Sequence, residues 1–168
     1  MRLSGPGFSA AEKHGKRDLK GQARRVVDVP PLTSTGLDLA HLIKAHVQGA
    51  AIHKSKTKAL HMLIQFPTEL VDGEDAARML DLARRFAEMV FGDQAIIADR
   101  VDRDMKSRHV VHLFLAPKYQ KITKRSSKLA ISTTKHLKEL AAKHGRAPTL
   151  RGQGQALQDA FAGFLQAE

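Results

Sequence analysis

Two acids and two histidines lie close together in the segment 101–117. Asp102 and Asp104 precede a short polar stretch, and His109 and His112 follow it. Imidazole nitrogens and carboxylate oxygens together form ligand sets that Mn²⁺, Mg²⁺ and Zn²⁺ accept in proteins. A divalent metal held by such a set would polarise a phosphodiester and offset the charge that develops as the bond breaks. The segment therefore predicts a metal site for phosphate chemistry.

Strand geometry restricts this metal prediction. Successive side chains of a strand point to opposite faces, so His109 and His112 share a metal only if His109 lies in the turn or a bulge intervenes. The alternative is an exposed hairpin tip with two unremarkable histidines. We expect Asp102, His109 and His112 as ligands and Asp104 as a neighbouring catalytic acid or occasional ligand. Mn²⁺ or Mg²⁺ is favoured over Zn²⁺ because the site is rich in oxygen and handles phosphate.

A candidate nucleophile lies near the start of the chain, where His14 stands among Lys13, Lys16 and Arg17. A neutral imidazole is a competent nucleophile near physiological pH, and the basic neighbours would hold flanking phosphates. The chain has no cysteine, and its one tyrosine, Tyr119, lies just past the end of the segment 101–117. We expect Tyr119 to stack on a base or contact the backbone. The alternative for His14 is an exposed histidine in a basic helix.

The charge balance points to a polyanionic partner. The 168 residues include 28 Lys and Arg against 17 Asp and Glu, a formal charge of +11. Each phosphate contact releases condensed counterions, which explains such an excess better than a small neutral substrate does. We expect Lys and Arg residues of the segment 118–146 to contact the DNA backbone without reading sequence.

Composition also bounds the class of protein. The absence of cysteine excludes disulfides and fits a reducing cytoplasm. No stretch approaches the roughly 18 apolar residues of a membrane span. A hydrophobic content of 42% supports a packed core. We expect one cytoplasmic domain over residues 1–168, which could be the N-terminal part of a longer protein.

Periodicity predicts the strands that position these residues. Apolar alternation predicts strands over 59–66, 94–103 and 109–116, the last two paired as an antiparallel hairpin. The strands and the helices between them predict an α+β fold, with a single antiparallel sheet and helices packed mainly on one face. The other face would remain open for a ligand.

The remaining elements follow from caps and helical spacing. A short helix is expected from Ser9, carrying His14, and another over 37–48. A long amphipathic helix should begin after Asp72 as its cap and end at Gly92. Further helices are expected over 133–143 and from about 154 onward, and the basic segment 118–125 is expected to be flexible.

The segment 102–117 resembles the metal-binding motif of the MobV-type plasmid mobilisation relaxases, in the HUH endonuclease superfamily. That motif reads His-x-Asp-Glu-x-Thr-Pro-His-x-His and is followed by Pro. Asp102 stands at the first His, Asp104 matches the Asp, and His109 matches the second His. His112 stands one position beyond the third His. The Glu position holds Met rather than an acid.

A second stretch extends the resemblance. Lys13-His14-Gly15-Lys16-Arg17 is similar to the family segment Lys-His-Asn-x-Arg, whose His is the nucleophile. The resemblance implies a relaxase that nicks one strand of a plasmid origin of transfer with help from Mn²⁺ or Mg²⁺. It implies a covalent 5′-phosphate link to His14, a partner DNA with a single-stranded or hairpin origin, and contacts with other transfer proteins. Two alternatives stay open: a catalytically inactive DNA-binding module of the same fold, and a basic RNA-binding α+β domain.

Overall fold

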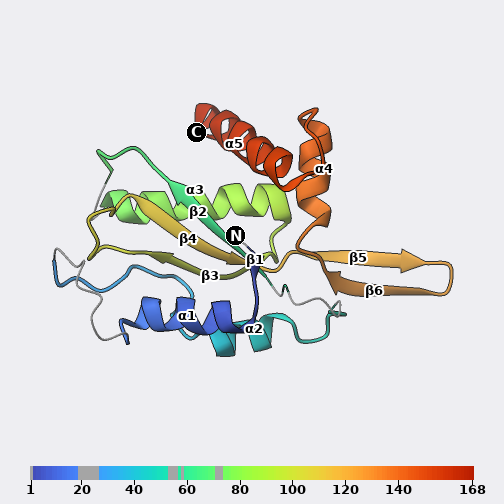
Figure 1. Ribbon diagram of the computed structural model, residues 1–168, viewed down its shortest axis with the longest axis horizontal. Coiled ribbons are helices and arrows are strands. Elements are labelled where there is room, and N and C mark those ends of the chain that lie inside the picture. Colours follow the sequence, from blue (N-terminus) through green and yellow to red (C-terminus); the bar gives the residue numbers. More distant parts are fainter. Residues whose placement is uncertain (1, 19–26, 53–56, 58, 71–73) are drawn as a thin grey trace.

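The computed structural model describes residues 2–18, 27–52, 57, 59–70 and 74–168. Five helices and six strands are assigned within these ranges (Figure 1). In chain order they are β1 (Arg2–Leu3), α1 (Gly5–Lys16), α2 (Leu39–His46), β2 (Ala59–Gln65), α3 (Glu74–Phe91), β3 (Ile96–Val101), β4 (Val110–Leu115), β5 (Lys118–Thr123), β6 (Ser126–Ile131), α4 (Lys135–Lys143) and α5 (Leu150–Ala167). In the described part of the chain, no helix has the length and apolarity needed to cross a bilayer.

Four strands form an antiparallel sheet in the order β1-β2-β4-β3. The predicted hairpin of β3 and β4 is present, and β2 pairs along the other side of β4 from Leu60↔Leu115 to Gln65↔Val110. In β3, Arg100 lies opposite His112 of β4. The register matters because opposed residues share a face of the sheet.

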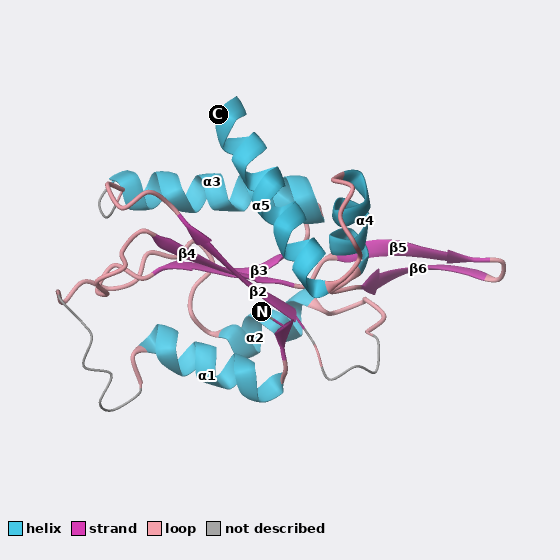
Figure 2. Cartoon of the chain, turned by 45° about the horizontal axis from the view of Figure 1, so that its top comes forward, coloured by secondary structure: helices cyan, strands magenta, loops and turns pink. Residues whose placement is uncertain are grey.

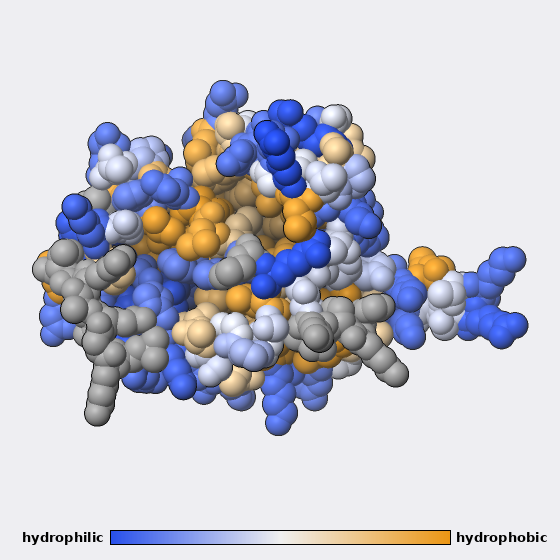
Figure 3. All heavy atoms as spheres, in the orientation of Figure 1, coloured by the Kyte–Doolittle hydropathy of each residue, from blue (hydrophilic) through white to orange (hydrophobic). Residues whose placement is uncertain are grey.

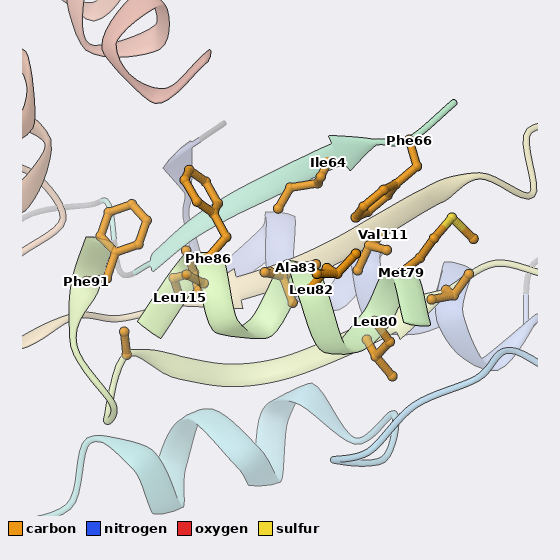
Figure 4. Close-up of a cluster of buried hydrophobic side chains, with 14 of the residues drawn as sticks. Ile64, Phe66, Met79, Leu80, Leu82, Ala83, Phe86, Phe91, Val111 and Leu115 are labelled. Atoms are coloured by element: carbon orange, nitrogen blue, oxygen red, sulfur yellow. The ribbon is translucent and has the colours of Figure 1, made fainter. Parts of the chain in front are cut away.

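One face of the sheet carries the larger hydrophobic core. The predicted apolar stripe of α3 is turned inward, and Met79, Ala83 and Phe86 are almost fully buried. Figure 4 shows Met79 and Phe86 of α3 on the same side of the sheet as Ile64 of β2. Helices α4 and α5 extend this layer, and α5 contributes Phe161, whose ring meets Phe86 edge-on.

The second face is covered in part by α1 and α2, which lie on the opposite side of the sheet from α3 (Figure 2). The α+β class with an antiparallel sheet is confirmed, but helices lie on both faces rather than mainly on one. The reason is that this face is also apolar near one end, where Phe114 packs with Phe8 of α1 and Leu39 of α2. Apolar strand positions on both faces need cover on both. Only the other end of this face is polar.

Two helices begin earlier than the sequence predicted. Helix α1 starts at Gly5 rather than Ser9, because Ser4 takes the extended N-cap conformation and Pro6 occupies the first turn, where a missing N–H costs nothing. Helix α5 starts at Leu150 rather than 154, and the Thr149 side chain caps it by accepting from the Gly152 N–H. The predicted cap Asp72 lies outside the described residues.

The basic segment 118–125, expected to be flexible, is instead one strand and the turn of a hairpin. Strands β5 and β6 form a separate two-stranded sheet, paired in full register from Lys118↔Ile131 to Thr123↔Ser126, and the hairpin projects from the body (Figure 1). Its base is fixed by the buried Ile131 and by a bridge between Ala51 and Ala130. The prediction of flexibility was based on the many basic residues of this segment, but exposed basic side chains are compatible with the alternating faces of a strand.

Candidate active site

The polar end of the second sheet face gathers side chains from α1, β2, β3 and β4. Arg100 and Asp102 are two residues apart and therefore point to one side, as does His112 opposite Arg100. Helix α1 crosses above them: Arg100 Nη1 donates to the Ala11 carbonyl oxygen at 3.3 Å, from beneath the helix. The fold thus lays the predicted N-terminal histidine helix over the predicted acid–histidine hairpin.

Asp102 is the centre of this cluster, and it is only 4% exposed. Its Oδ1 lies 2.7 Å from Arg100 Nε and 3.2 Å from Arg17 Nη2. Its Oδ2 lies 3.3 Å from His14 Nε2 and 3.6 Å from His112 Nε2. Burial by itself raises the pKa of Asp102, but the guanidinium charges of Arg100 and Arg17 bring that pKa below its ordinary value. Asp102 is therefore a carboxylate at neutral pH.

Arg17 fixes the end of α1 to the same hairpin. Its Nε donates to Asp104 Oδ2 at 2.7 Å, and its Nη2 bonds to the other oxygen of Asp104. Its Nη1 also donates to the carbonyl oxygen of His14 at 2.6 Å. Burial lowers the pKa of Arg17, but the bond to Asp104 and the charge of Asp102 together raise it. The predicted catalytic acid Asp104 thus holds a guanidinium in a forked contact.

His61 and His112 form the floor of the cluster. His61 Nε2 lies 3.0 Å from His112 Nδ1, and the His61 ring stacks on Phe114 with centroids 4.6 Å apart. Burial first, then the charge of Arg100, lowers the pKa of His61 to about 4 and that of His112 to about 3. Both imidazoles are therefore neutral at physiological pH.

His14 lies at the rim, with 29% of its side chain exposed. Its bond to the carboxylate of Asp102 requires a proton on Nε2, which in a neutral ring leaves the lone pair on Nδ1. Asp102 therefore fixes the tautomer and the orientation of this imidazole, as the orienting acid does for the histidine of a catalytic triad. A nucleophile held by a third group is the arrangement that covalent catalysis uses.

His109 lies apart from this network. It precedes β4, its carbonyl oxygen accepts from the Phe66 N–H at 2.9 Å, and its Nε2 lies 3.1 Å from Nε2 of Gln65. The residue two positions before His112, which shares its face, is Val110 rather than a histidine. The structure thus brings His14, Asp102, Asp104 and His112 together and places His109 elsewhere.

Tyr119 is also remote from the cluster. It lies on β5, at the base of the projecting hairpin, with Lys135 Nζ 5.6 Å from the centroid of its ring. This position agrees with its expected exclusion from the nucleophile role.

Neither Arg100 nor His61 was predicted from the sequence as part of the site. Strand alternation was the available signal. Arg100 and Asp102 are two residues apart and so face the same side of the sheet, and His61 pairs with Phe114, which lies two residues from His112 on that side.

The cluster does not fit a divalent metal. Among the described residues, no group of three or more His, Asp or Glu side chains is arranged to hold an ion. Asp102 is instead saturated by two guanidiniums and two imidazoles. The metal predicted through Asp102, His109 and His112 therefore stays a prediction, and no chemical step below depends on it.

A groove lies on the other side of the sheet. It has a volume of about 770 Å³ and is lined by residues of α3, α4 and α5 that include Met89, Leu140 and Phe164. Apolar and charged side chains share its walls, none of them belongs to the acid–histidine cluster, and it therefore has no part in the chemistry of that cluster.

Comparison with known proteins identifies the fold. No family model matches the chain, and no curated protein matches it by sequence. Solved structures do match: the MobM relaxase domain (MOBV; Mob_Pre) bound to plasmid pMV158 oriT DNA of 22 nucleotides, Mn-bound at pH 5.5, superposes with a TM-score of 0.58 at 13% identity. The match covers 92% of this chain and 83% of that one. The chain has the fold of a relaxase domain.

Two further structures of the MobM domain give the same result. One is bound to oriT DNA of 22 nucleotides with a 3′ thiophosphate, Mn-bound at pH 6.8, with a TM-score of 0.56 at 14% identity over 92% of this chain and 83% of that one. The other is bound to oriT DNA of 26 nucleotides, with a TM-score of 0.51 at 13% identity over the same shares. At these identities the likeness establishes the fold.

Proposed function

We propose that this chain binds single-stranded DNA at a plasmid origin of transfer and cuts one strand, with His14 as the nucleophile. The observation that carries the proposal is the contact of His14 Nε2 with Asp102 Oδ2 at 3.3 Å, within a relaxase fold. That contact joins the two stretches of sequence that resemble relaxase motifs, 88 residues apart. A plasmid substrate would also place the protein in the cytoplasm.

The chemistry follows from the orientation of the ring. Nδ1 of His14 attacks the phosphorus, the N–P bond forms, and the bond from phosphorus to the 3′ oxygen breaks. The leaving 3′ oxygen takes a proton from water, and the phosphorylated ring gives one up. Asp102 stabilises the positive imidazole ring that forms on attack, as a buried carboxylate does beside any histidine that becomes charged. The product is a 5′ phosphoramidate, which keeps the bond energy needed for strand transfer.

Arg17 supports this reaction from the same helix. It is the C-terminal cap of α1, three residues after His14, and 12% of its side chain is exposed at the rim, while Asp104 fixes its orientation. A guanidinium held in this way would bind a phosphate oxygen and offset charge on the phosphorane. A cation that is already oriented loses little entropy when the substrate binds.

The β5–β6 hairpin provides a second DNA contact in this proposal. Lys121 and Lys128 lie directly opposite one another on exposed strands, an arrangement that repels unless an anion lies against it. The hydrophilic side chains gather at the far end of the hairpin (Figure 3). A basic ribbon of this kind tracks a phosphate backbone and does not read bases.

A covalent-capture experiment tests the function. The full chain is incubated with single-stranded oligonucleotides of random sequence labelled at the 3′ end, denatured, and examined for labelled protein. We expect a labelled adduct in the wild type and in Tyr119→Phe, and none in His14→Ala, although His14→Ala should still bind the oligonucleotides. An adduct in His14→Ala would remove His14 from the role.

The inactive DNA-binding module is the outcome if the wild type binds the oligonucleotides and forms no adduct. The departures from the family motif, with Asp102 in place of the first His and His112 one position beyond the third, are the observations that favour this second function. Preference for RNA over DNA in the same binding assay would favour the remaining alternative, a basic RNA-binding domain.

A further inference from the structure

Arg100 is a buried cation inside the acid–histidine cluster. It is 3% exposed, its Nε lies 2.7 Å from Asp102 Oδ1, and its Nη2 lies 3.4 Å from both Asp102 Oδ2 and His112 Nδ1. It therefore occupies the space between the acid and the histidine that the sequence analysis assigned to one metal ion.

The charges of the cluster are already balanced. Asp102 and Asp104 contribute two negative charges, and Arg17 and Arg100 contribute two positive ones. A divalent ion bound to Asp102 would add two positive charges to a region that excludes water, beside two guanidiniums. Burying charge without a partner is costly, so binding would require Arg100 to leave.

Arg100 is enclosed and has no simple way out. The α1 backbone lies directly on it: a Cβ added to Gly15 would overlap Arg100 Nη1, and the Ala11 carbonyl oxygen accepts from that same nitrogen. Removing the guanidinium from Asp102 would mean lifting α1, which carries His14 and Arg17. The same contact therefore positions the helix and fills the site.

We propose that Arg100 is the permanent cation of this site, taking the place that a divalent metal would need. The chain then binds DNA phosphate without a divalent ion, and where the inference extends to strand cleavage it rests on the function proposed above. Arg100 itself is a positioning residue: it holds Asp102 and α1, and the partly exposed Arg17 and His14 meet the phosphate.

The register supplies a gain-of-function test. Arg100 is opposite His112, at about 4.5–5.5 Å between Cβ atoms, and shares a face with Asp102. Arg100→His would therefore remove the guanidinium and set two imidazoles and a carboxylate around the space it leaves. Mn²⁺ and Zn²⁺ both accept such ligands.

The experiment titrates the full chain with Mn²⁺ and with Zn²⁺ in the absence of DNA, by calorimetry and by thermal unfolding. For the wild type we expect no saturable binding and no rise in Tm. For Arg100→His we expect saturable binding and a rise in Tm that EDTA reverses. Arg78→His is the matched control, because Arg78 is exposed on α3 and far from the cluster, and it should behave as the wild type does.

Two results would overturn the proposal. The first is saturable Mn²⁺ binding by the wild type that His112→Ala abolishes. The second is an Arg100→His variant that folds, binds DNA and gains no metal, since something other than Arg100 would then exclude the ion. If Arg100→His fails to fold, the wild-type titration with its His112→Ala comparison decides alone.

A DNA arm separates this inference from the proposed function. Wild-type binding to the random oligonucleotides should be unchanged by EDTA, and any covalent adduct should form equally in EDTA and in Mn²⁺. A protein that binds no metal and forms no adduct leaves the inference standing and removes the proposed cleavage. An adduct that forms only with added metal removes the inference and keeps the cleavage.

Discussion

The backbone of Gly15 in α1 lies directly against the guanidinium of Arg100, with no room for a side chain between them. This contact decides where α1 sits, because the helix approaches the sheet as closely as a backbone can. It also sets the distance between His14, the residue before Gly15, and the carboxylate of Asp102, which contacts Arg100. A glycine at this position therefore links the buried cation to the proposed nucleophile.

Gly15→Ala should destabilise the protein by about 1–3 kcal/mol, the usual cost of forcing extra volume into a packed interior. Arg100 would normally swing aside, but Asp102 and the helix hold it. Urea unfolding followed by circular dichroism measures the change.

Gly163→Ala is the matched control for that variant. Gly163 is also inside a helix, α5, but a Cβ there meets nothing within 4 Å. The substitution should stabilise the protein by about 0.5–1 kcal/mol, because alanine loses less backbone entropy on folding. Equal effects of the two changes would mean that the contact with Arg100 imposes no constraint.

Lys121→Ala on the hairpin should weaken binding to single-stranded DNA and lower its salt dependence. Removal of one phosphate interaction reduces the slope of log K against log salt by about 0.7 for a single strand. Fluorescence anisotropy with a random oligonucleotide, from about 50 to 200 mM salt, measures both quantities. Arg78→Ala removes one positive charge from an exposed position of α3, outside the hairpin, and should leave the slope unchanged.

Stability should fall as the pH falls below about 6.5. The pKa of His61 is lowered to about 4 and that of His112 to about 3, from 6.5, so between these values the unfolded chain binds more protons than the folded one. Protons therefore favour unfolding, and the stabilisation present above pH 6.5 is lost progressively toward pH 4. One pKa unit corresponds to about 1.4 kcal/mol, so the loss by pH 4 is on the order of 3 kcal/mol per histidine.

His61→Gln tests the source of that pH dependence. Glutamine does not titrate, so urea midpoints measured between pH 7.5 and about 4.5 should vary less with pH than in the wild type. His41→Gln, at an exposed position of α2, should reproduce the wild-type profile. A profile that His61→Gln leaves unaltered would assign the pH dependence to other groups.

Local patterns in the sequence predicted most of the elements and part of the site. Alternation predicted β2, β3 and β4, and helical spacing predicted the buried stripe of α3, because each pattern follows from the geometry of one element. The cover of α1 and α2 over the second face was missed. Which helix packs on which face depends on contacts between elements far apart in the chain, and a single segment carries no trace of them.

The same distinction holds at the site. The choice of His14, Asp102 and His112 as candidates, which the structure brings into contact, could be made from residue type and resemblance. The central place of Arg100 could not, since it depends on the register that sets Arg100 opposite His112 and on the helix laid over it. His109 lies in the turn that precedes β4 and contacts Gln65 rather than the cluster, and no pattern in the sequence indicated that contact.

The covalent adduct should be lost in mild acid and persist in alkali. A phosphoramidate at His14 hydrolyses once the other ring nitrogen is protonated, because the neutral imidazole then leaves phosphorus readily, whereas a phosphotyrosine ester at Tyr119 survives the same treatment. Labelled adduct formed at neutral pH would be held in dilute acid or in dilute base, then separated under denaturing conditions.

Asp102→Asn tests the role of the carboxylate in forming the adduct. The amide keeps the shape of the carboxylate but gives no negative charge to the ring that becomes positive on attack, and it leaves Arg100 and Arg17 without their shared partner. Adduct formation should then fall by two to four orders of magnitude, about the loss seen when the orienting acid of a catalytic triad is changed to its amide. Arg78→Ala removes an exposed charge from α3 and leaves the Asp102 network intact, and its adduct yield should stay near that of the wild type. Acid-stable adduct, or full yield from Asp102→Asn, would contradict the arrangement in which Asp102 orients His14.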